Sequence, residues 1–271
     1  MPELPEVETT RRSVAPHVER QKVTAVRIYD SRLRWPVPRN LARCLVGRMI
    51  ERVERRSKYL LFCVGDGALI VHLGMTGSLL AYRTAPARRP HDHIDLEFGN
   101  GVVLRYHDPR RFGAMLWSPR RVLHHPLLAH LGPEPLSPAF NRDYLFQATR
   151  DRTAAIKLAV MDNRVVVGVG NIYANESLFR AGIRPATPAR RISAQRLGRL
   201  VDAVKETLSQ AIAKGGSTLR DYVDSNGQPG RFQLDYQVYG REGEPCRSCG
   251  TRIRAVRLGG RASAYCPSCQ R

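Results

Sequence analysis

Four cysteines near the carboxyl end of the chain have the spacing of a metal site. Two residues separate Cys246 from Cys249 and Cys266 from Cys269, and sixteen residues lie between the pairs. Two such pairs are typical of one tetrahedral zinc site, and four thiolates leave no position for a catalytic water. All eight histidines lie at or before His130, so no imidazole competes nearby. We therefore expect one structural Zn²⁺ per chain, bound by these four cysteines.

The segment between the cysteine pairs is strongly basic. A small metal-bound hairpin with this charge could bind phosphates, although a merely solvated hairpin would have the same composition. The arginines in question are Arg252, Arg254, Arg257 and Arg261.

The amino terminus could supply a nucleophile. Removal of Met1 would expose the secondary amine of Pro2, whose reference pKa of about 8 leaves part of it neutral at working pH. Arginine stays protonated, so amine chemistry must come from Pro2 or from one of the five lysines. Glu3 follows directly and could act as an acid or base. The same stretch also fits a plain helix start with acids at its positive end.

Two other places offer groups for a phosphate. Lys58 follows three polar residues and opens an apolar strand, where it could bind an anion or simply protect a sheet edge. Residues 168–171 (GVGN) precede a predicted helix, and their backbone N–H groups could bind a phosphate. A packing turn is the alternative for this glycine-rich stretch.

The charge of the whole chain indicates a polyanionic partner. Its 271 residues include 44 basic and 24 acidic side chains, a formal net charge of +20 that exceeds what solubility requires. No stretch approaches the roughly 18 apolar residues of a membrane helix, and the start lacks the apolar segment of a signal peptide. We expect a cytoplasmic protein.

The elements that must position these residues change in type along the chain. A short helix is expected from Pro5 or Val7, and residues 22–117 then form mainly short strands, with a hairpin at Gly99-Asn100-Gly101. No helices intervene, so an antiparallel sandwich or barrel is expected. Three prolines within residues 131–141 mark a connector.

Helical spacing dominates beyond this connector. Apolar residues from Leu197 to Ile212 recur at helical intervals between a Ser193 cap and Gly215-Gly216. Shorter helices are expected over residues 153–161 and 171–181. The predicted fold class is therefore α+β and multidomain, with strands first, helices second and the cysteine hairpin last.

Five stretches together resemble bacterial formamidopyrimidine-DNA glycosylase. The match runs in order from Pro2 to Gln270. Endonuclease VIII, a related family, is similar in Pro2-Glu3 and the zinc finger but usually has glycine where this chain has Leu4. The matching stretches are residues 1–9 (MPELPEVET), 72–79 (HLGMTGSL), 108–113 (DPRRFG), 168–174 (GVGNIYA) and 261–270 (RASAYCPSCQ).

The resemblance implies a domain order that agrees with the pattern of strands and helices. An N-terminal β-sandwich catalytic domain would cover residues 1–131, with a linker at 132–152. A helix-two-turn-helix DNA-binding domain would follow at 153–240, including a lesion-capping loop at 217–233. A zinc finger would complete the chain at 241–271, and DNA would bind in the cleft between the two halves.

The resemblance also implies a reaction. A flipped 8-oxoguanine or formamidopyrimidine nucleotide would enter the site, because chemistry on a stacked base is sterically blocked. Pro2 would attack C1′ of the sugar, expel the base and form an iminium, with Glu3 as the acid/base. A β,δ-elimination would then cut the strand. The enzyme would be a bifunctional glycosylase and abasic-site lyase of base-excision repair.

Other roles are carried over by position in the motifs. Lys58 would hold a phosphate near the lesion, and Asn171 and Arg261 would grip the kinked backbone. Lys58 and Arg261 would also count among the catalytic residues, with Pro2 and Glu3. Met75, Arg110 and Phe112 would fill the gap left by the flipped base, as an apolar wedge, a cation and a ring can do. The remaining predicted DNA contacts are His91, Lys157 and Arg220, the last standing where some relatives have lysine.

The predicted partner is double-stranded DNA that contains a damaged base or an abasic site. We expect a monomer without membrane association, located in the bacterial cytoplasm with the nucleoid. Two alternatives stay open at this stage. One is an endonuclease VIII-like glycosylase for oxidised pyrimidines, and the other is a zinc-finger protein that binds damaged DNA without cutting it.

Overall fold

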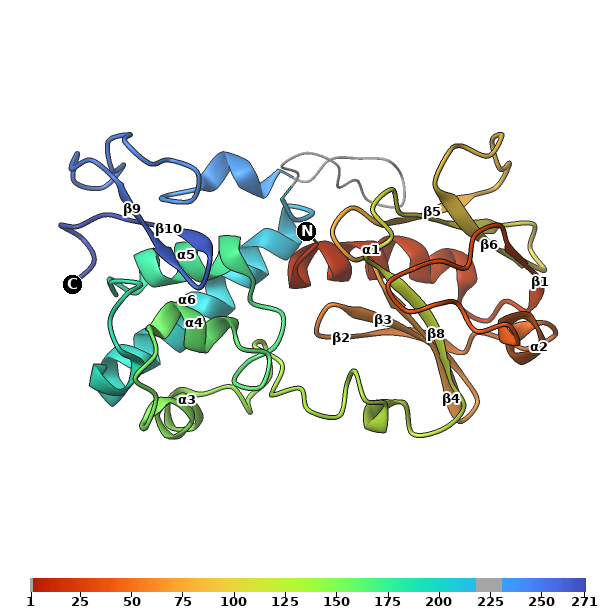
Figure 1. Cartoon of the computed structure of the whole chain (residues 1–271), viewed down its shortest axis with the longest axis horizontal. Helices are drawn as coiled ribbons and strands as arrows, with labels where there is room; N and C mark the ends of the chain where they lie inside the picture. The colour runs from red at the N-terminus through yellow and green to blue at the C-terminus, as the bar shows by residue number, and fades with distance from the viewer. Residues whose placement is uncertain (1, 218–230) are drawn as a thin grey trace. The chain divides into compact units, whose positions relative to one another are not determined.

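The computed structural model describes residues 2–217 and 231–271 (Figure 1). The chain divides into two compact units, each with its own core. The first unit comprises Met1–Ala129 and Lys214–Arg231, and the second comprises His130–Ala213 and Phe232–Arg271. The described parts of each unit are treated separately below.

The first unit is a β-sandwich of two four-stranded antiparallel sheets, one of the two architectures that the strand pattern allowed and the one that the resemblance implied. Apolar side chains from both sheets, including Leu60, Leu69, Ile94 and Tyr106, form its core. The strand order of one sheet is β1 (Val23–Ile28), β6 (Asp92–Phe98), β7 (Val103–His107) and β5 (Ser78–Tyr82), and that of the other is β2 (Arg52–Arg56), β3 (Tyr59–Val64), β4 (Gly67–His72) and β8 (Ala114–Ser118).

Helix α1 (Leu4–Val18) packs against strands of both sheets. It begins at Leu4, slightly before the predicted start, with Glu3 as its N-cap and proline in its first turn, where the missing N–H costs nothing. Leu4, Val7 and Val14 lie on its buried face. The helix therefore fixes the amino terminus against the sandwich. The described residues of this unit also include two short helical segments, α2 (Leu41–Leu45) and η1 (Val122–His124).

The predicted hairpin joins β6 to β7. Gly101 has φ of +80° and donates its N–H to Phe98 at 2.9 Å, while Phe98 donates to Val102 at 2.9 Å. Gly101 is the one residue of this turn with a left-handed backbone conformation. The hairpin is therefore a type I turn followed by a glycine bulge, and not a two-residue turn.

The second unit is helical. Its helices are α3 (Arg142–Thr149), α4 (Ile156–Met161), α5 (Asn171–Arg180) and α6 (Ala194–Ala213), with two 3₁₀ turns, η2 (Ala189–Arg191) and η3 (Phe232–Asp235). Helix α6 confirms the predicted long amphipathic helix. The Ser193 hydroxyl accepts the Arg196 N–H at 3.4 Å at its start, and Gly215 and Gly216 follow its end with positive φ.

The segment expected to be a linker, residues 132–152, contains helix α3. Leu145 of this helix and Phe140 just before it are buried in the core of the second unit. The sequence analysis missed this helix for two reasons. The prolines upstream indicate irregular chain, and α3 itself has only eight residues. Part of the predicted connector is therefore a structural element of the helical unit.

The cysteine segment forms a hairpin of β9 (Arg254–Leu258) and β10 (Arg261–Tyr265) over a small core of its own. The four arginines named above are all exposed on it. Among the residues that the structure describes, no helix is long and apolar enough to cross a membrane.

Candidate active site and nucleic-acid interface

Pro2 and Glu3 lie buried at the start of α1. Glu3 is 3% exposed, and its backbone is extended at the N-cap position. The N–H of Glu3 is held at 2.8 Å by the carboxylate of Glu6, one turn further along the helix. This bond fixes the direction in which the chain enters the helix, and with it the positions of the residues proposed for catalysis.

The Glu6 carboxylate also binds the segment that follows α6. Its second oxygen accepts the N–H of Ser217 at 2.8 Å. Gly216 makes this approach possible, since it has φ of +80° and a Cβ there would lie 2.9 Å from the Glu6 carboxylate. One buried carboxylate thus joins the start of α1 to the residue at which the predicted lesion-capping loop begins.

Lys58 lies in the tight turn between β2 and β3, next to Ser57, which has φ of +57°. The guanidinium of Arg55 holds this turn, because it donates to the Ser57 carbonyl at 3.0 Å and pairs with Glu8 of α1 at 3.2 Å. Burial alone would raise the pKa of Glu8, but hydrogen bonds from arginines, Arg11 first, outweigh it and lower the pKa. Glu8 therefore stays ionised and anchors the Lys58 turn to helix α1.

His72 lies beside this turn, although the sequence analysis did not single it out. Its ring is 4.9 Å from that of Tyr59, its partner across β3 and β4. Burial, and then the charges of Lys58 and Arg34, lower the pKa of His72 to about 4. Its Nδ1 accepts the Gly74 N–H at 3.1 Å, so the neutral ring carries its proton on Nε2. The position of a histidine at the head of the HLGM stretch was the available signal.

Met75 and Phe112 are large apolar side chains on the surface of the sandwich. They are 38% and 42% exposed. The guanidinium of Arg110 stacks on the Phe112 ring at 4.8 Å. These residues are not part of the sandwich core.

A cavity of about 530 Å³ adjoins the side chains of Arg110 and Phe112. Arg110, Arg111 and Phe112 line one side of it, and the segment from Arg32 to Arg34 lines the other. Its wall thus combines cations with one aromatic ring, a composition suited to a nucleobase and its phosphates.

His91 lies in a second cavity of about 390 Å³, which is lined by arginines, among them Arg88 and Arg89, and by the carboxylates of Asp30 and Asp92. The residue is exposed and has φ of +70°, a conformation that costs energy for a non-glycine residue. The ring of Tyr29 supports this cavity by stacking under the Arg88 guanidinium at 4.3 Å. Arg111 pairs with Asp30 and Arg89 pairs with Asp92, so the cavity carries charges of both signs, and the contact of His91 with DNA stays a prediction.

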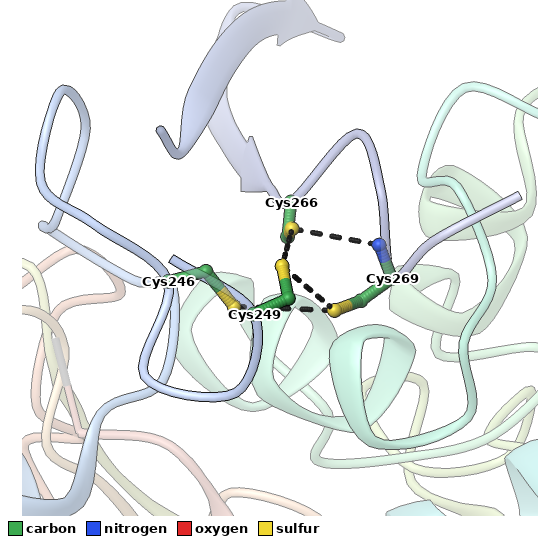
Figure 2. A group of neighbouring side chains, drawn as sticks. All are labelled: Cys246, Cys249, Cys266 and Cys269. Atoms are coloured by element: carbon green, nitrogen blue, oxygen red, sulfur yellow. Dashed lines mark hydrogen bonds between the residues drawn. The ribbon is translucent and has the colours of Figure 1, made fainter. Parts of the chain in front are cut away.

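Figure 2 shows the four cysteine side chains converging from the two ends of the hairpin segment. Their Sγ atoms all lie within 4.8 Å of one another. Individual separations are 4.0 Å for Cys246–Cys269, 3.5 Å for Cys249–Cys266 and 3.4 Å for Cys249–Cys269. Four sulfurs about 2.3 Å from one zinc ion would lie about 3.8 Å apart, so the geometry fits a tetrahedral site.

The chemistry of the donors supports the same assignment. Contact with the Cys249 sulfur, followed by burial, raises the pKa of Cys269 to about 12, whereas hydrogen bonds with Thr251 lower that of Cys249 to about 6. Four thiols this close cannot all ionise at neutral pH unless a cation compensates their charge. The chain therefore holds one structural zinc ion.

Lys157, predicted as a DNA contact, is buried in the second unit. It is 0% exposed, and its Nζ donates to the Ala262 carbonyl at 2.8 Å and the Ser263 hydroxyl at 2.7 Å. Both acceptors lie in β10, directly after the exposed Arg261. The structure places Lys157 as an internal link between α4 and the zinc hairpin.

Asn171 begins α5, after Gly168 with φ of +77° and Gly170 as N-cap. The first turn of the helix offers backbone N–H groups at this point, together with the positive end of the helix dipole. Arg220, the last predicted DNA contact, lies outside the described residues, as does most of the predicted capping loop.

These observations define a zinc-containing enzyme that acts on nucleic acid: a basic sandwich with a buried Pro2-Glu3 terminus, exposed apolar side chains beside arginines, and a helical unit with a cationic zinc hairpin. Three family models match the chain. They are the formamidopyrimidine-DNA glycosylase N-terminal domain over residues 1–115, the formamidopyrimidine-DNA glycosylase H2TH domain over 131–223, and a zinc finger found in FPG and IleRS over 243–271.

Relatives match along their full length. Formamidopyrimidine-DNA glycosylases of Paraburkholderia phymatum and Methylococcus capsulatus are 56% and 54% identical, each covered over 100% of both chains. The MutM (FPG) structure of Thermus thermophilus is 42% identical with a TM-score of 0.88, covering 99% of this chain and 98% of that one. A Lactococcus lactis Fpg complex with abasic-site DNA is 34% identical, with a TM-score of 0.91 and full coverage of both chains.

The chain belongs to the formamidopyrimidine-DNA glycosylase family. It is a base-excision repair glycosylase that removes oxidised purines and also has abasic-site lyase activity. The fold class predicted from the sequence is confirmed. Neither the endonuclease VIII-like alternative nor the non-catalytic binder is favoured by these relatives.

Proposed function

We propose that Pro2 is the nucleophile of this enzyme and that Glu3 is its acid/base. The amine exposed by removal of Met1 attacks C1′ of the damaged nucleotide, and the base leaves with the bonding electrons. The carbon–nitrogen bond that forms becomes an iminium when the sugar ring opens. The observation that carries the proposal is the burial of Pro2-Glu3 at the N-cap of α1, held there by Glu6.

The role of Glu3 follows from its place beside that amine. Its carboxyl group can give a proton to the ring oxygen of the sugar as the ring opens and take one back during elimination. Elimination on both sides of the opened sugar then cuts the strand, and hydrolysis releases Pro2.

DNA is held, in this proposal, by cations and helix N–H groups of both units. Lys58 in the first unit and Arg261 and Asn171 in the second bind phosphates near the lesion. His91 and Arg220 contribute further DNA contacts, and His72 offers an Nε2–H donor beside Lys58. Met75, Arg110 and Phe112 fill the gap that the flipped nucleotide leaves.

The partner is double-stranded DNA containing an oxidised purine or an abasic site. The solved relatives from Lactococcus lactis are complexes with abasic-site DNA and with DNA containing Fapy-dG, which supports this choice. We propose that the enzyme works as a monomer in the bacterial cytoplasm, at the nucleoid. It is not expected to bind membranes.

Borohydride trapping tests the proposal directly. The protein, with removal of Met1 checked by intact mass, is incubated with duplex DNA containing an abasic site and with borohydride. Reduction of the iminium should leave one chain covalently joined to each DNA strand. A version extended by a few residues before Pro2 should lose trapping and base excision, because an amide nitrogen is not nucleophilic, while DNA binding is retained. Full trapping by the extended protein would rule out Pro2 and point to a lysine.

A further inference from the structure

Asp108 lies where two loops of the first unit meet. It follows β7, is 0% exposed, and precedes the loop that carries Arg110 and Phe112. The other loop, residues 73–77, joins β4 to β5 and carries Met75. Asp108 thus lies between the two loops whose exposed side chains were assigned to the gap in the DNA.

The Asp108 carboxylate bonds to both loops. One oxygen accepts the hydroxyl of Thr76 at 3.2 Å, and the other accepts the N–H of Gly113 at 2.8 Å. The buried hydroxyl of Tyr106 approaches this second oxygen at 3.3 Å. Each loop therefore has its own bond to a single side chain.

The backbones of the two loops are also in direct contact. A Cβ on Gly74, which has φ of +62°, would lie 2.5 Å from the backbone nitrogen of Gly113. A Cβ on Gly113 would lie 1.7 Å from the Tyr106 hydroxyl oxygen. No side chain fits at either position, so two glycines permit the contact that the Asp108 carboxylate then secures.

Asp108 itself is held by the sandwich. Its carbonyl accepts the Nε2–H of the buried His93 at 2.8 Å, and its N–H donates to the His91 carbonyl at 3.1 Å. Motion of either loop thus requires breaking a bond to a group that is fixed in the core.

We propose that Asp108 is a positioning residue that locks the Met75 loop and the Phe112 loop into one rigid element, so that Met75, Arg110 and Phe112 enter the DNA together. The inference rests on the gap-filling role given to these side chains above. Preorganisation of this kind reduces the entropy lost on binding, because the loops are ordered before DNA arrives.

Three variants of the full-length, zinc-loaded protein test the bonds from the Asp108 carboxylate to each loop separately. Thr76→Val keeps a branched side chain and removes only the bond to the Met75 loop, whereas Asp108→Ala removes the bonds to both loops. Asp108→Asn should preserve both, because its carbonyl oxygen can accept from Gly113 and its NH₂ can donate to the Thr76 hydroxyl. Thr149→Val, which removes a buried hydroxyl from α3, is the matched control.

Amide hydrogen exchange in the absence of DNA tests the lock alone. The reporter of the Met75 loop is Gly77, whose N–H donates to the Leu73 carbonyl at 2.8 Å across that loop. Thr76→Val should speed exchange at Gly77 by about threefold to tenfold, the range expected for one lost hydrogen bond, and leave exchange at Gly113 unchanged within about twofold. Asp108→Ala should speed exchange at both positions, while Asp108→Asn and Thr149→Val should speed neither. If the amide of Gly77 exchanged in Thr76→Val at the same rate as in the parent protein, the proposal would be overturned, even if Asp108→Ala fails to fold.

A double-mutant cycle tests the joint action of the two loops. The readout is the ratio of affinities for duplex DNA with an abasic-site analogue and for undamaged duplex. In the parent protein, the factor by which Met75→Ala/Phe112→Ala lowers this ratio should differ by at least about threefold from the product of the factors for the two single variants. When the same cycle is measured in a protein that also carries Thr76→Val, the difference should be less than about twofold. Equal coupling in both backgrounds would refute the lock. If neither single variant changes the ratio while exchange behaves as expected, the gap-filling role fails and the lock between the loops stands.

Discussion

Replacing Glu3 by glutamine keeps the size of the side chain and removes its ability to transfer a proton. We expect at least about 100-fold slower base excision in single turnover, in line with general acid/base contributions, because Glu3 lies buried beside the proposed nucleophile. DNA affinity should change little. Glu97→Gln, which removes the same charge from a surface ion pair, is the control. Near-parental excision by Glu3→Gln would show that Glu3 serves only as the helix cap.

Lys157 can be tested as an anchor against its predicted role as a DNA contact. Lys157→Met keeps the length of the side chain and leaves the Ala262 carbonyl and the Ser263 hydroxyl without this donor, which should destabilise the protein by about 1–3 kcal/mol in thermal or urea unfolding. An anchor predicts weaker DNA binding with an unchanged salt dependence, since no phosphate contact is lost. A DNA contact predicts a salt slope lower by about one. Lys205→Met, on the partly exposed face of α6, is the control.

The contrast between these two residues shows what the sequence could predict. The zinc ligands could be predicted because the spacing of the four cysteines is typical of one tetrahedral site. The acid/base role of Glu3 stays a prediction, and it could be made because Glu3 directly follows Pro2 in the sequence. The burial of Lys157 could not be found, because its acceptors lie more than 100 residues further along the chain. Asp108 was visible only as part of the DPRRFG stretch, since its bonds to Thr76 and Gly113 arise from tertiary packing.

At the scale of elements, the zinc hairpin should depend on its metal. Cys249→Ser removes one ligand, and metal binding supplies much of the free energy that orders so small a hairpin. DNA affinity should therefore fall before the sandwich unfolds, and zinc content should drop from one per chain. Cys44→Ser changes a cysteine of the sandwich unit that is not a ligand, and it should leave both unchanged. Unaltered DNA affinity in a zinc-free Cys249→Ser protein would contradict the role of the hairpin.

Strand and helix types were predictable because alternating and helical spacing persisted over several residues, as in β6, β7 and α6. Helix α3 was not, because its eight residues follow a proline-rich segment that indicates irregular chain. A short element is specified by its partners in the core more than by its own sequence. Its contribution to the second unit could be seen only in the folded structure.

At the scale of the whole molecule, the net charge of +20 should dominate binding to any duplex. Cations that neutralise phosphates release counterions, so affinity should fall by about 0.9 log unit per log unit of salt for each phosphate contacted. Lys58→Ala and Arg261→Ala should each weaken binding to all sequences and lower this slope by about one. Arg142→Ala, whose guanidinium already pairs with Asp143 on α3, is a comparator for loss of one exposed charge.

The salt dependence of DNA affinity should distinguish the side chains that neutralise phosphates from those that fill the gap in the DNA. Phe112→Ala removes an exposed ring and no charge, so it should leave the slope unchanged and reduce the preference for lesion DNA over plain duplex. Arg110→Ala should alter the preference for the base opposite the lesion more than the slope, because its guanidinium stacks on Phe112 beside the cavity rather than standing alone. Titration of both duplexes from about 50 to 200 mM salt measures the two effects together. A changed slope with intact lesion preference in Phe112→Ala would mean that the ring supports the phosphate contacts of its neighbours instead of replacing a base.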